Sequence, residues 1–300
     1  MKKNKLKKTV YIAWFFMLIV SILPEVIIKE LIKIEVSNLQ EIRIIFMVFV
    51  YLISFKIKQL SYLRNFIIVL SVITILNYLG EILQNIEIYD NLFGGVNKSF
   101  TQALASYQII NLIKAFIMFF VLLKILKKRS NFFLVKGDLR AIAMPIKGMV
   151  KNPIPWRKFA LQFGIYMTLG LIIFLFVAGG IPSKENIIKI LPIFPLILIF
   201  AAINSLYEEL NFRAAIISTL KNELTSDQAL WISSVYFGII HFYGVPYGII
   251  GVLLATFLGY IIAKSMIESK GFVYAFLLHI IQDIIIFVFL AIGSITAGGV

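Results

Sequence analysis

The chain of 300 residues contains no cysteine, only two histidines, and 15 acidic residues against 29 lysines and arginines. Without cysteine there is no disulfide, no thiolate metal site and no thiol nucleophile. The chain also lacks the polar composition that the surface of a soluble domain requires, because 60% of its residues are hydrophobic and its mean hydropathy is +0.94. These absences exclude an ordinary soluble domain and a cysteine-based enzyme.

Long apolar runs recur along the whole chain. Runs of about 18 or more apolar residues are typical of membrane-spanning helices. We therefore expect an all-α polytopic transmembrane bundle with eight to nine membrane helices and a catalytic core formed by the C-terminal ones. The predicted spans are residues 10–28, 44–55, 66–83, 103–123, 159–178, 187–220, 229–243, 247–263 and 272–292.

The net charge of +14 could indicate a nucleic-acid partner, but basic loops beside a membrane explain it better. The longest polar stretch, residues 124–158, contains ten lysines and arginines against the single acid Asp138. We interpret it as a cytoplasmic loop, with contact to anionic lipid as the alternative. The expected protein is multi-pass in the cell membrane, with a cytoplasmic amino terminus and no nucleic-acid partner.

Pro153 and Pro155 close this stretch and indicate a boundary between two units. Residues 1–150 should form N-terminal transmembrane helices and the basic loop. Residues 151–300 should form the unit that carries the chemistry.

Three charged residues interrupt the sixth predicted span. A charged side chain inside a bilayer costs about 2.5–3.5 kcal/mol on insertion scales, so Glu208, Glu209 and Arg213 need a reason to be there. Glu209 and Arg213 are spaced i, i+4 with the acid first, which predicts an ion pair. Glu208 points about 100° away on a regular helix, so we expect it to lack this partner and to exchange protons. Asn204 lies one turn earlier and could orient Glu208.

The two histidines lie in later apolar segments. Glu208 and His241 are equally far from the centre of the loop at residues 221–228, so an antiparallel helix pair would place them at matched depth, roughly 15–20 Å from the cytoplasmic ends. His279 and Asp283 share a helix face at i, i+4, as do Phe237 and His241. Three helices are therefore predicted to deliver polar side chains to one layer, opening to the cytoplasmic side.

The three motifs Glu208-Glu209-x-x-x-Arg213, Phe237-x-x-x-His241 and His279-x-x-x-Asp283 occur in this order on predicted membrane helices. Together they resemble the CPBP family, which comprises the type II CAAX prenyl endopeptidases and the bacterial bacteriocin-processing and self-immunity (Abi) membrane proteins. The resemblance covers residues 187–290. The four N-terminal helices show no recognised motif.

The resemblance implies an intramembrane endopeptidase of the glutamate type, a hydrolase often described as an intramembrane metalloprotease. By similarity, Glu208 activates water with help from His241, and His279 and Asp283 stabilise the oxyanion. Many relatives have asparagine at the position of Asp283. An ionised aspartate cannot donate a hydrogen bond, so Asp283 is either protonated or orients His279.

The remaining residues of the predicted site have supporting roles. By similarity, Glu209 and Arg213 hold the catalytic groups in place, although they could also be only a structural ion pair. Phe237, an apolar residue on an apolar helix, is expected to pack nearby. Lys114, with Asn111 on the fourth predicted helix, could reach the site or pair with Glu81.

Other interpretations stay open from the sequence. Glu208, His241 and His279 would also form a catalytic zinc set, although we favour a mechanism without metal or cofactor. A non-proteolytic immunity or scaffold protein would keep the same motifs, and a transporter could use Glu208, His241 and Lys114 as a proton relay. High isoleucine and lysine fit a bacterial chain, for which the expected partners are the lipid bilayer and a peptide or membrane-protein substrate in peptide or bacteriocin processing or self-immunity.

Overall fold

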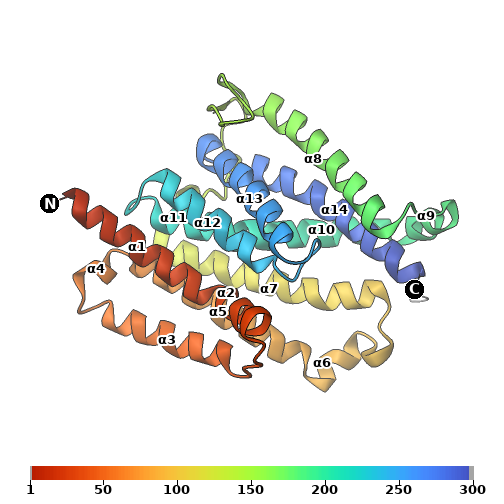
Figure 1. Cartoon of the computed structure of the whole chain (residues 1–300), viewed down its shortest axis with the longest axis horizontal. Coiled ribbons are helices and arrows are strands. Elements are labelled where there is room, and N and C mark those ends of the chain that lie inside the picture. Colours follow the sequence, from red (N-terminus) through yellow and green to blue (C-terminus); the bar gives the residue numbers. More distant parts are fainter. Residues whose placement is uncertain (1, 297–300) are drawn as a thin grey trace.

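The computed structural model describes residues 2–296, with side chains from residue 7 onward. The predicted cytoplasmic amino terminus includes Lys2, Lys3 and Lys5, whose side chains lie outside the described part of the chain. Met1, which begins the first predicted unit, and Val300, which ends the second, also lie outside it. The described chain is a polytopic helical membrane bundle in which most long helices lie along roughly the same axis (Figure 1).

The amino-terminal half consists of helices and short turns. Its α-helices are α1 (Lys2–Val20), α2 (Leu23–Val26), α3 (Leu39–Ile53), α4 (Lys58–Ser61), α5 (Arg64–Gln84), α6 (Glu87–Leu92) and α7 (Phe100–Leu126). A two-residue antiparallel pair, β1 (Ile142–Ala143) and β2 (Ile154–Pro155), follows. The carboxyl-terminal half contains α8 (Trp156–Gly179), α9 (Lys184–Ile190), α10 (Phe194–Glu208), α11 (Ile216–Leu220), α12 (Ser226–Ile240), α13 (Ile249–Ser269) and α14 (Val273–Thr296).

Six helices of the described chain are long and apolar enough to cross a membrane, or seven if a bent pair is one span. The six are Arg64–Gln84, Phe100–Leu126, Trp156–Gly179, Lys184–Leu220, Ile249–Ser269 and Val273–Thr296. The bent pair, Lys7–Val20 with Leu23–Ile32, changes direction by 56°.

The predicted number of eight to nine membrane helices exceeds this count. The predicted spans at residues 44–55 and 229–243 do form helices, α3 and α12, but each has 15 residues. At 1.5 Å per residue such a helix is about 22 Å long, which is shorter than the hydrocarbon core of about 30 Å. By length, neither helix alone counts as a full crossing.

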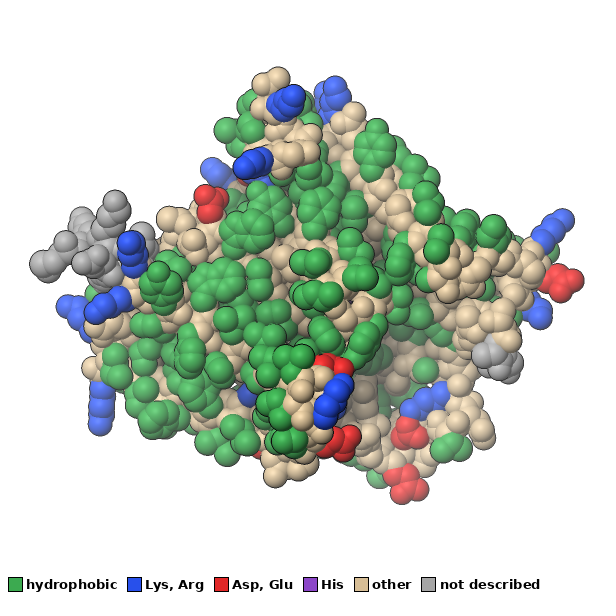
Figure 2. Space-filling model, viewed as in Figure 1, with side chains coloured by type: hydrophobic (Ala, Val, Ile, Leu, Met, Phe, Trp, Pro, Cys, Tyr) green, Lys and Arg blue, Asp and Glu red, His purple; other side chains and the backbone are tan. Residues whose placement is uncertain are grey.

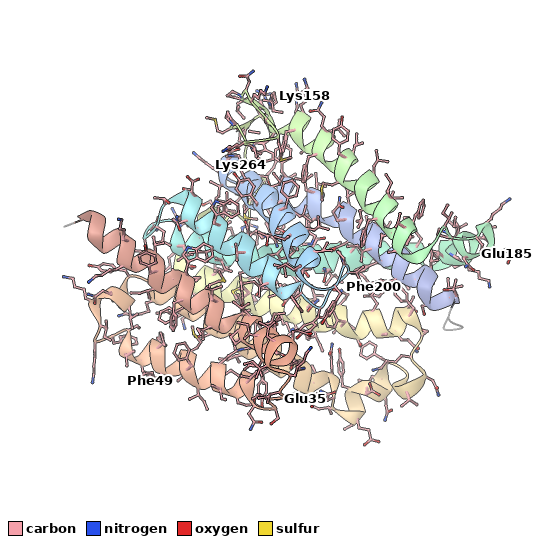
Figure 3. All side chains as sticks on the ribbon, viewed as in Figure 1. Glu35, Phe49, Lys158, Glu185, Phe200 and Lys264 are labelled. Carbon is pink, nitrogen blue, oxygen red and sulfur yellow. The ribbon has the colours of Figure 1, made fainter. Side chains whose placement is uncertain are left out.

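The outer surface of the bundle is apolar, as a multi-pass protein requires. Large hydrophobic side chains such as Phe49 on α3 and Tyr166 and Val177 on α8 are exposed, and hydrophobic atoms cover most of the face in Figure 2. Because lipid is as apolar as these side chains, their exposure is favourable only in a membrane. Charged side chains gather instead at the ends and loops, as Lys158, Glu185 and Glu35 illustrate (Figure 3).

The basic segment after α7 is folded against the bundle. The backbone N–H of Asp138 donates to Ser269 O at 2.7 Å, and Gly137, at φ +74°, lies so close to Gly271 that an added Cβ would be 2.6 Å from its Cα. Trp156 is fully buried, and its Nε1 donates to Glu268 Oε2 at 2.8 Å. The segment is therefore fastened to the turn between α13 and α14.

The predicted span at residues 247–263 ends too early, because α13 continues through Ser269. Lys264 and Glu268 therefore lie on this helix. They form an i, i+4 ion pair at 2.6 Å on that helix. The pair uses Glu268 Oε1, so Glu268 Oε2 can accept from Trp156 Nε1. These two contacts explain why polar residues are found in the last turns of the helix.

Replacing Trp156 tests this attachment. Trp156→Phe removes a buried hydrogen bond to a carboxylate and part of a fully buried ring, so we expect the free energy of unfolding to fall by about 1–3 kcal/mol. The measurement is the fraction of purified protein that stays monodisperse on size-exclusion chromatography after heating. Trp231→Phe is the matched control, because Trp231 is 45% exposed. Equal thermal loss in both variants would contradict the attachment.

Candidate active site

The site is built on the longest span of the structure, Lys184–Leu220. Within it, residues Glu209–Ala215 form a π-helical segment between α10 and α11, and all seven are buried. A π-helical turn is wider than an α-helical one and is found frequently at functional sites. It begins immediately after Glu208, so the two adjacent glutamates lie where the helix changes its pitch.

The predicted ion pair between Glu209 and Arg213 is confirmed. Arg213 Nη1 lies 3.3 Å from Glu209 Oε1, and neither side chain has any exposed surface. The guanidinium also stacks on Phe237, with Cζ 3.4 Å from the ring centroid. Gly259 of α13 makes room for this stack, because a Cβ there would lie 3.2 Å from Arg213 Nη2. Phe237 therefore does pack at the site, as predicted.

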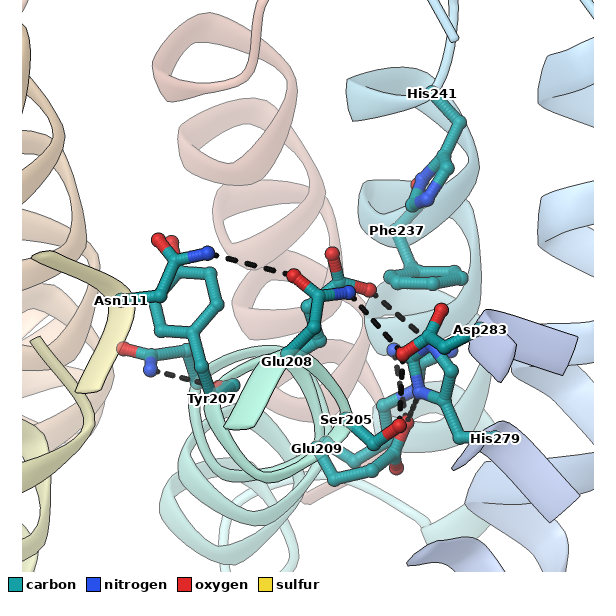
Figure 4. A network of polar contacts seen from close by, with 12 residues as sticks. Asn111, Ser205, Tyr207, Glu208, Glu209, Phe237, His241, His279 and Asp283 are labelled. Carbon is teal, nitrogen blue, oxygen red and sulfur yellow. Dashed lines mark hydrogen bonds and ion pairs between the residues drawn. The ribbon is translucent and has the colours of Figure 1, made fainter. Parts of the chain in front are cut away.

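His279 of α14 lies between the two glutamates (Figure 4). Its Nδ1 is 2.6 Å from Glu209 Oε1, and its Nε2 is 3.3 Å from Glu208 Oε2 and 3.6 Å from Asp283 Oδ1. Glu208 lacks Arg213 as an ion-pair partner, as expected, but it is not without a partner. That expectation considered only partners on the same helix, whereas one imidazole on a facing helix has two nitrogens and reaches both carboxylates.

Asp283 accepts hydrogen bonds from the α10 helix. Its Oδ2 receives Ser205 Oγ at 2.7 Å and Asn204 Nδ2 at 3.2 Å. Asn204 was predicted to orient Glu208, but its amide donates to Asp283 instead. The reason is helix rotation: α10 packs against α14, and the face that carries Asn204 and Ser205 meets Asp283 there.

The network extends to α7, in the part of the chain where the sequence showed no motif. Asn204 Oδ1 accepts from Gln108 Nε2 at 3.3 Å and from Asn111 Nδ2 at 3.4 Å. The sequence did contain a signal for these residues. Gln108, Asn111 and Lys114 recur every three residues on an otherwise apolar helix, and a polar stripe of this kind indicates a buried polar contact.

His241 follows the last residue of α12 and points its Nδ1 at Phe237 O, 2.7 Å away. Because a carbonyl only accepts, Nδ1 carries the proton in this contact and Nε2 of a neutral ring is left as an acceptor. His241 and Glu208 line the same cavity of about 600 Å³. The Glu208 side chain is 15% exposed and that of His279 only 4%, so Glu208 is the more accessible of the two, and it lines the cavity together with His241.

Much of the remaining cavity wall comes from the amino-terminal half, which sequence reasoning did not assign to the site. Arg43, Asn77, Tyr107 and Lys114 are among the lining residues. The contacts of Lys114 settle one of the alternatives left open: its Nζ donates to Asn77 Oδ1 at 3.1 Å, and Glu81 accepts from Gln40 instead.

The zinc alternative was tested against the arrangement of the donors. Among the residues that the structure describes, no three histidine, aspartate or glutamate side chains are arranged to hold a metal ion. Both nitrogens of His279 already face carboxylate oxygens. Glu208, His241 and His279 therefore do not fit a zinc site in this arrangement, and we derive no catalytic step through zinc.

Comparison with known families identifies the carboxyl-terminal half. Residues 190–285 match the family described as Type II CAAX prenyl endopeptidase Rce1-like. These residues thus form a domain similar to this family, and the resemblance seen in the sequence is confirmed over that range. The range contains the Glu208, His241, His279 and Asp283 positions. No curated protein and no solved structure matches the chain.

The buried charges predict a characteristic pattern of stability. Glu209→Gln leaves Arg213 without its close anion, and breaking a buried pair in this way costs about 3–5 kcal/mol of unfolding free energy. Glu209→Gln/Arg213→Met removes both charges and should recover part of that loss. The measurement is thermal unfolding of the purified variants. Lys29→Met, which breaks an exposed pair with Glu25, should change stability by about 1 kcal/mol or less.

If the double variant were as unstable as the sum of its two single variants, the pair would not be energetically coupled. Equal losses of stability from Lys29→Met and Glu209→Gln would show that the buried pair contributes no more to stability than the exposed pair.

Proposed function

We propose that the chain is an intramembrane endopeptidase that hydrolyses a peptide bond of a membrane-associated peptide or protein. The observation that carries the proposal is that Glu208 and His241, from two different helices, line one cavity, with His279 buried behind Glu208. An acid and a base that share a cavity can activate a water molecule between them. The family match over residues 190–285 supports the same reaction class.

In the proposed reaction Glu208 and His241 bind the attacking water, and Glu208 accepts its proton. The water oxygen bonds to the carbonyl carbon, and the carbonyl oxygen becomes an oxyanion. His279 Nε2, which faces Glu208 in the structure, is the nearest donor for this charge. The carbon–nitrogen bond then breaks, and the proton held by Glu208 passes to the leaving nitrogen, which departs as an amine.

Glu209 and Asp283 position His279 in this scheme. Glu209 Oε1 fixes Nδ1 at 2.6 Å, as second carboxylates commonly do for catalytic imidazoles. Asp283 accepts from Ser205 and Asn204 and lies 3.6 Å from His279 Nε2. These contacts support the interpretation that Asp283 orients His279 rather than donating to the oxyanion.

We propose an orientation that differs from the predicted one, because the residues that line the cavity do not favour a cavity on the same side as the amino terminus. The cavity is lined by Val20 and Glu25 at the end of the first bent span, by Gln84 at the end of α5 and by Gly244 after α12. These positions are at the opposite end of α1 from the amino terminus. Because α12 has only 15 residues and His241 follows its last residue, we infer that His241 lies near the side of the membrane opposite the amino terminus.

Of the two parts of the predicted orientation, the cytoplasmic amino terminus is better supported than the cytoplasmic opening of the cavity. Lysine and arginine side chains lie in Figure 2 at the left and top of the view, where the amino-terminal end and the basic segment around Lys158 are found, and others lie at the centre and right beside most of the acidic side chains. Basic segments stay in the cytoplasm. We therefore propose a cytoplasmic amino terminus and an active-site cavity that opens toward the outer face of the cell membrane.

Single cysteines test the orientation directly, because the chain has none of its own. Ser37 and Ser130 are both exposed, one in the loop before α3 and the other in the basic segment. In intact cells, a membrane-impermeant maleimide should label Ser37→Cys and leave Ser130→Cys unlabelled until the cells are lysed. The opposite pattern would place the cavity on the cytoplasmic side.

Proteolysis is tested by comparing the amino termini of membrane and secreted peptides by mass spectrometry. The strains are wild type, a deletion, and deletions complemented with Glu208→Gln or Glu185→Gln at matched expression. General acid–base catalysis contributes about 10²–10⁴-fold, so the product should disappear with Glu208→Gln. Glu185→Gln is the matched control because Glu185 is exposed and distant from the site (Figure 3).

If Glu208→Gln restores the wild-type peptides and phenotype, the proteolytic function is wrong and a binding role in immunity or scaffolding replaces it. Treatment of the purified enzyme with a zinc chelator gives a separate test. Cleavage should persist, and its loss with recovery on added zinc would establish the metal-dependent alternative.

A further inference from the structure

One basic side chain of the cavity has no role in the proposed hydrolysis and forms no close ion pair. Lys114 of α7 is 8% exposed and lines the cavity. Its Nζ donates to the neutral Asn77 Oδ1 at 3.1 Å and lies 5.6 Å from the centre of the Tyr207 ring. Among the described residues, no carboxylate lies within 4.0 Å of it.

The acids of the same cavity are engaged elsewhere. Glu25 lies 3.5 Å from Arg43, Glu81 accepts from Gln40 at 2.6 Å, and Glu208 faces His279. A buried ammonium group without a paired anion is unfavourable. Of the two cations that line the cavity among the described residues, Arg43 lies beside Glu25, whereas Lys114 has no carboxylate within ion-pair distance, so an incoming anion can approach Lys114.

Neighbouring residues leave room for the Lys114 side chain and hold its ammonium group at the cavity. Gly80 of α5 lies against the end of the side chain, and a Cβ there would be 2.7 Å from Lys114 Cε. Asn77 Oδ1 also accepts from Tyr207 Oη at 3.2 Å. Tyr207 directly precedes Glu208, so the ammonium group is connected through Asn77 and Tyr207 to the helix that carries the proposed base.

We propose that Lys114, held by Asn77 beside Tyr207, forms an anion subsite that binds a carboxylate of the peptide substrate. The carboxylate is either the terminal one of the peptide or that of an aspartate or glutamate side chain. This inference rests on the proposed function for its substrate class. It assigns a specificity role to the amino-terminal half, outside the residues that match the family.

Binding is measured in the Glu208→Gln background, so that no probe is cleaved. The probes are a fluorescent four-residue apolar peptide with a free terminal carboxylate, its terminal amide, and amides with an internal glutamate or glutamine. The full chain is held in phosphatidylcholine nanodiscs, and fluorescence anisotropy gives each Kd. A charged hydrogen bond is worth about 1.5–3 kcal/mol, so one acidic probe should bind at least about tenfold more tightly than its neutral counterpart.

Lys114→Met should remove this preference, leaving less than about a twofold difference, while the neutral probes bind as before. Lys124→Met is the matched control, because Lys124 is exposed on the same helix, and it should keep the preference. Because Lys114→Met removes an unpaired buried charge, its thermal stability should not fall. The probe that shows the preference identifies the source of the carboxylate.

The subsite is overturned if neither acidic probe binds more tightly than its neutral counterpart, or if the preference survives in Lys114→Met. Cleavage of the same probes by the chain with intact Glu208 is measured separately. A Lys114-dependent preference without cleavage would refute proteolysis and keep the subsite. Cleavage of the probes without a Lys114-dependent preference would support proteolysis and refute the subsite.

Discussion

The structure depends on a buried set of charges that compensate one another inside the membrane. His279 faces Glu209 through one nitrogen and Glu208 through the other, and Arg213 lies against Glu209 with no exposed surface. Each of these groups alone would be unfavourable in a bilayer. Together they fix the relative rotation of α14 and the long helix through α10, because one imidazole must reach two adjacent carboxylates.

This requirement explains the packing around the cluster. Phe237 covers the guanidinium of Arg213, and Gly259 leaves room for both. The π-helical segment starts at Glu209, the residue that touches both His279 and Arg213. The burial of this cluster leaves Glu208 and His241 as the polar groups of the predicted motifs that meet the cavity. In the proposed function, these two groups react and the buried ones position them.

The two halves of the chain contribute differently to the same cavity. Residues 190–285, which match the endopeptidase family, supply the cluster, Glu208 and His241. The amino-terminal half supplies further wall and the unpaired Lys114. Chemistry and substrate selection would thus reside in separate segments, so the amino-terminal helices could diverge in sequence while the hydrolytic groups stayed in place.

The sequence by itself determined the membrane bundle, the motif residues and the Glu209–Arg213 ion pair, because hydropathy and i, i+4 spacing are local properties of one helix. It could not determine the number of full crossings, since α3 and α12 are apolar but too short. Only the tertiary structure decided that His279 contacts Glu208, that Asn204 donates to Asp283, and at which end of α1 the cavity lies. These features depend on how separate helices are rotated and shifted against each other, which local spacing does not encode.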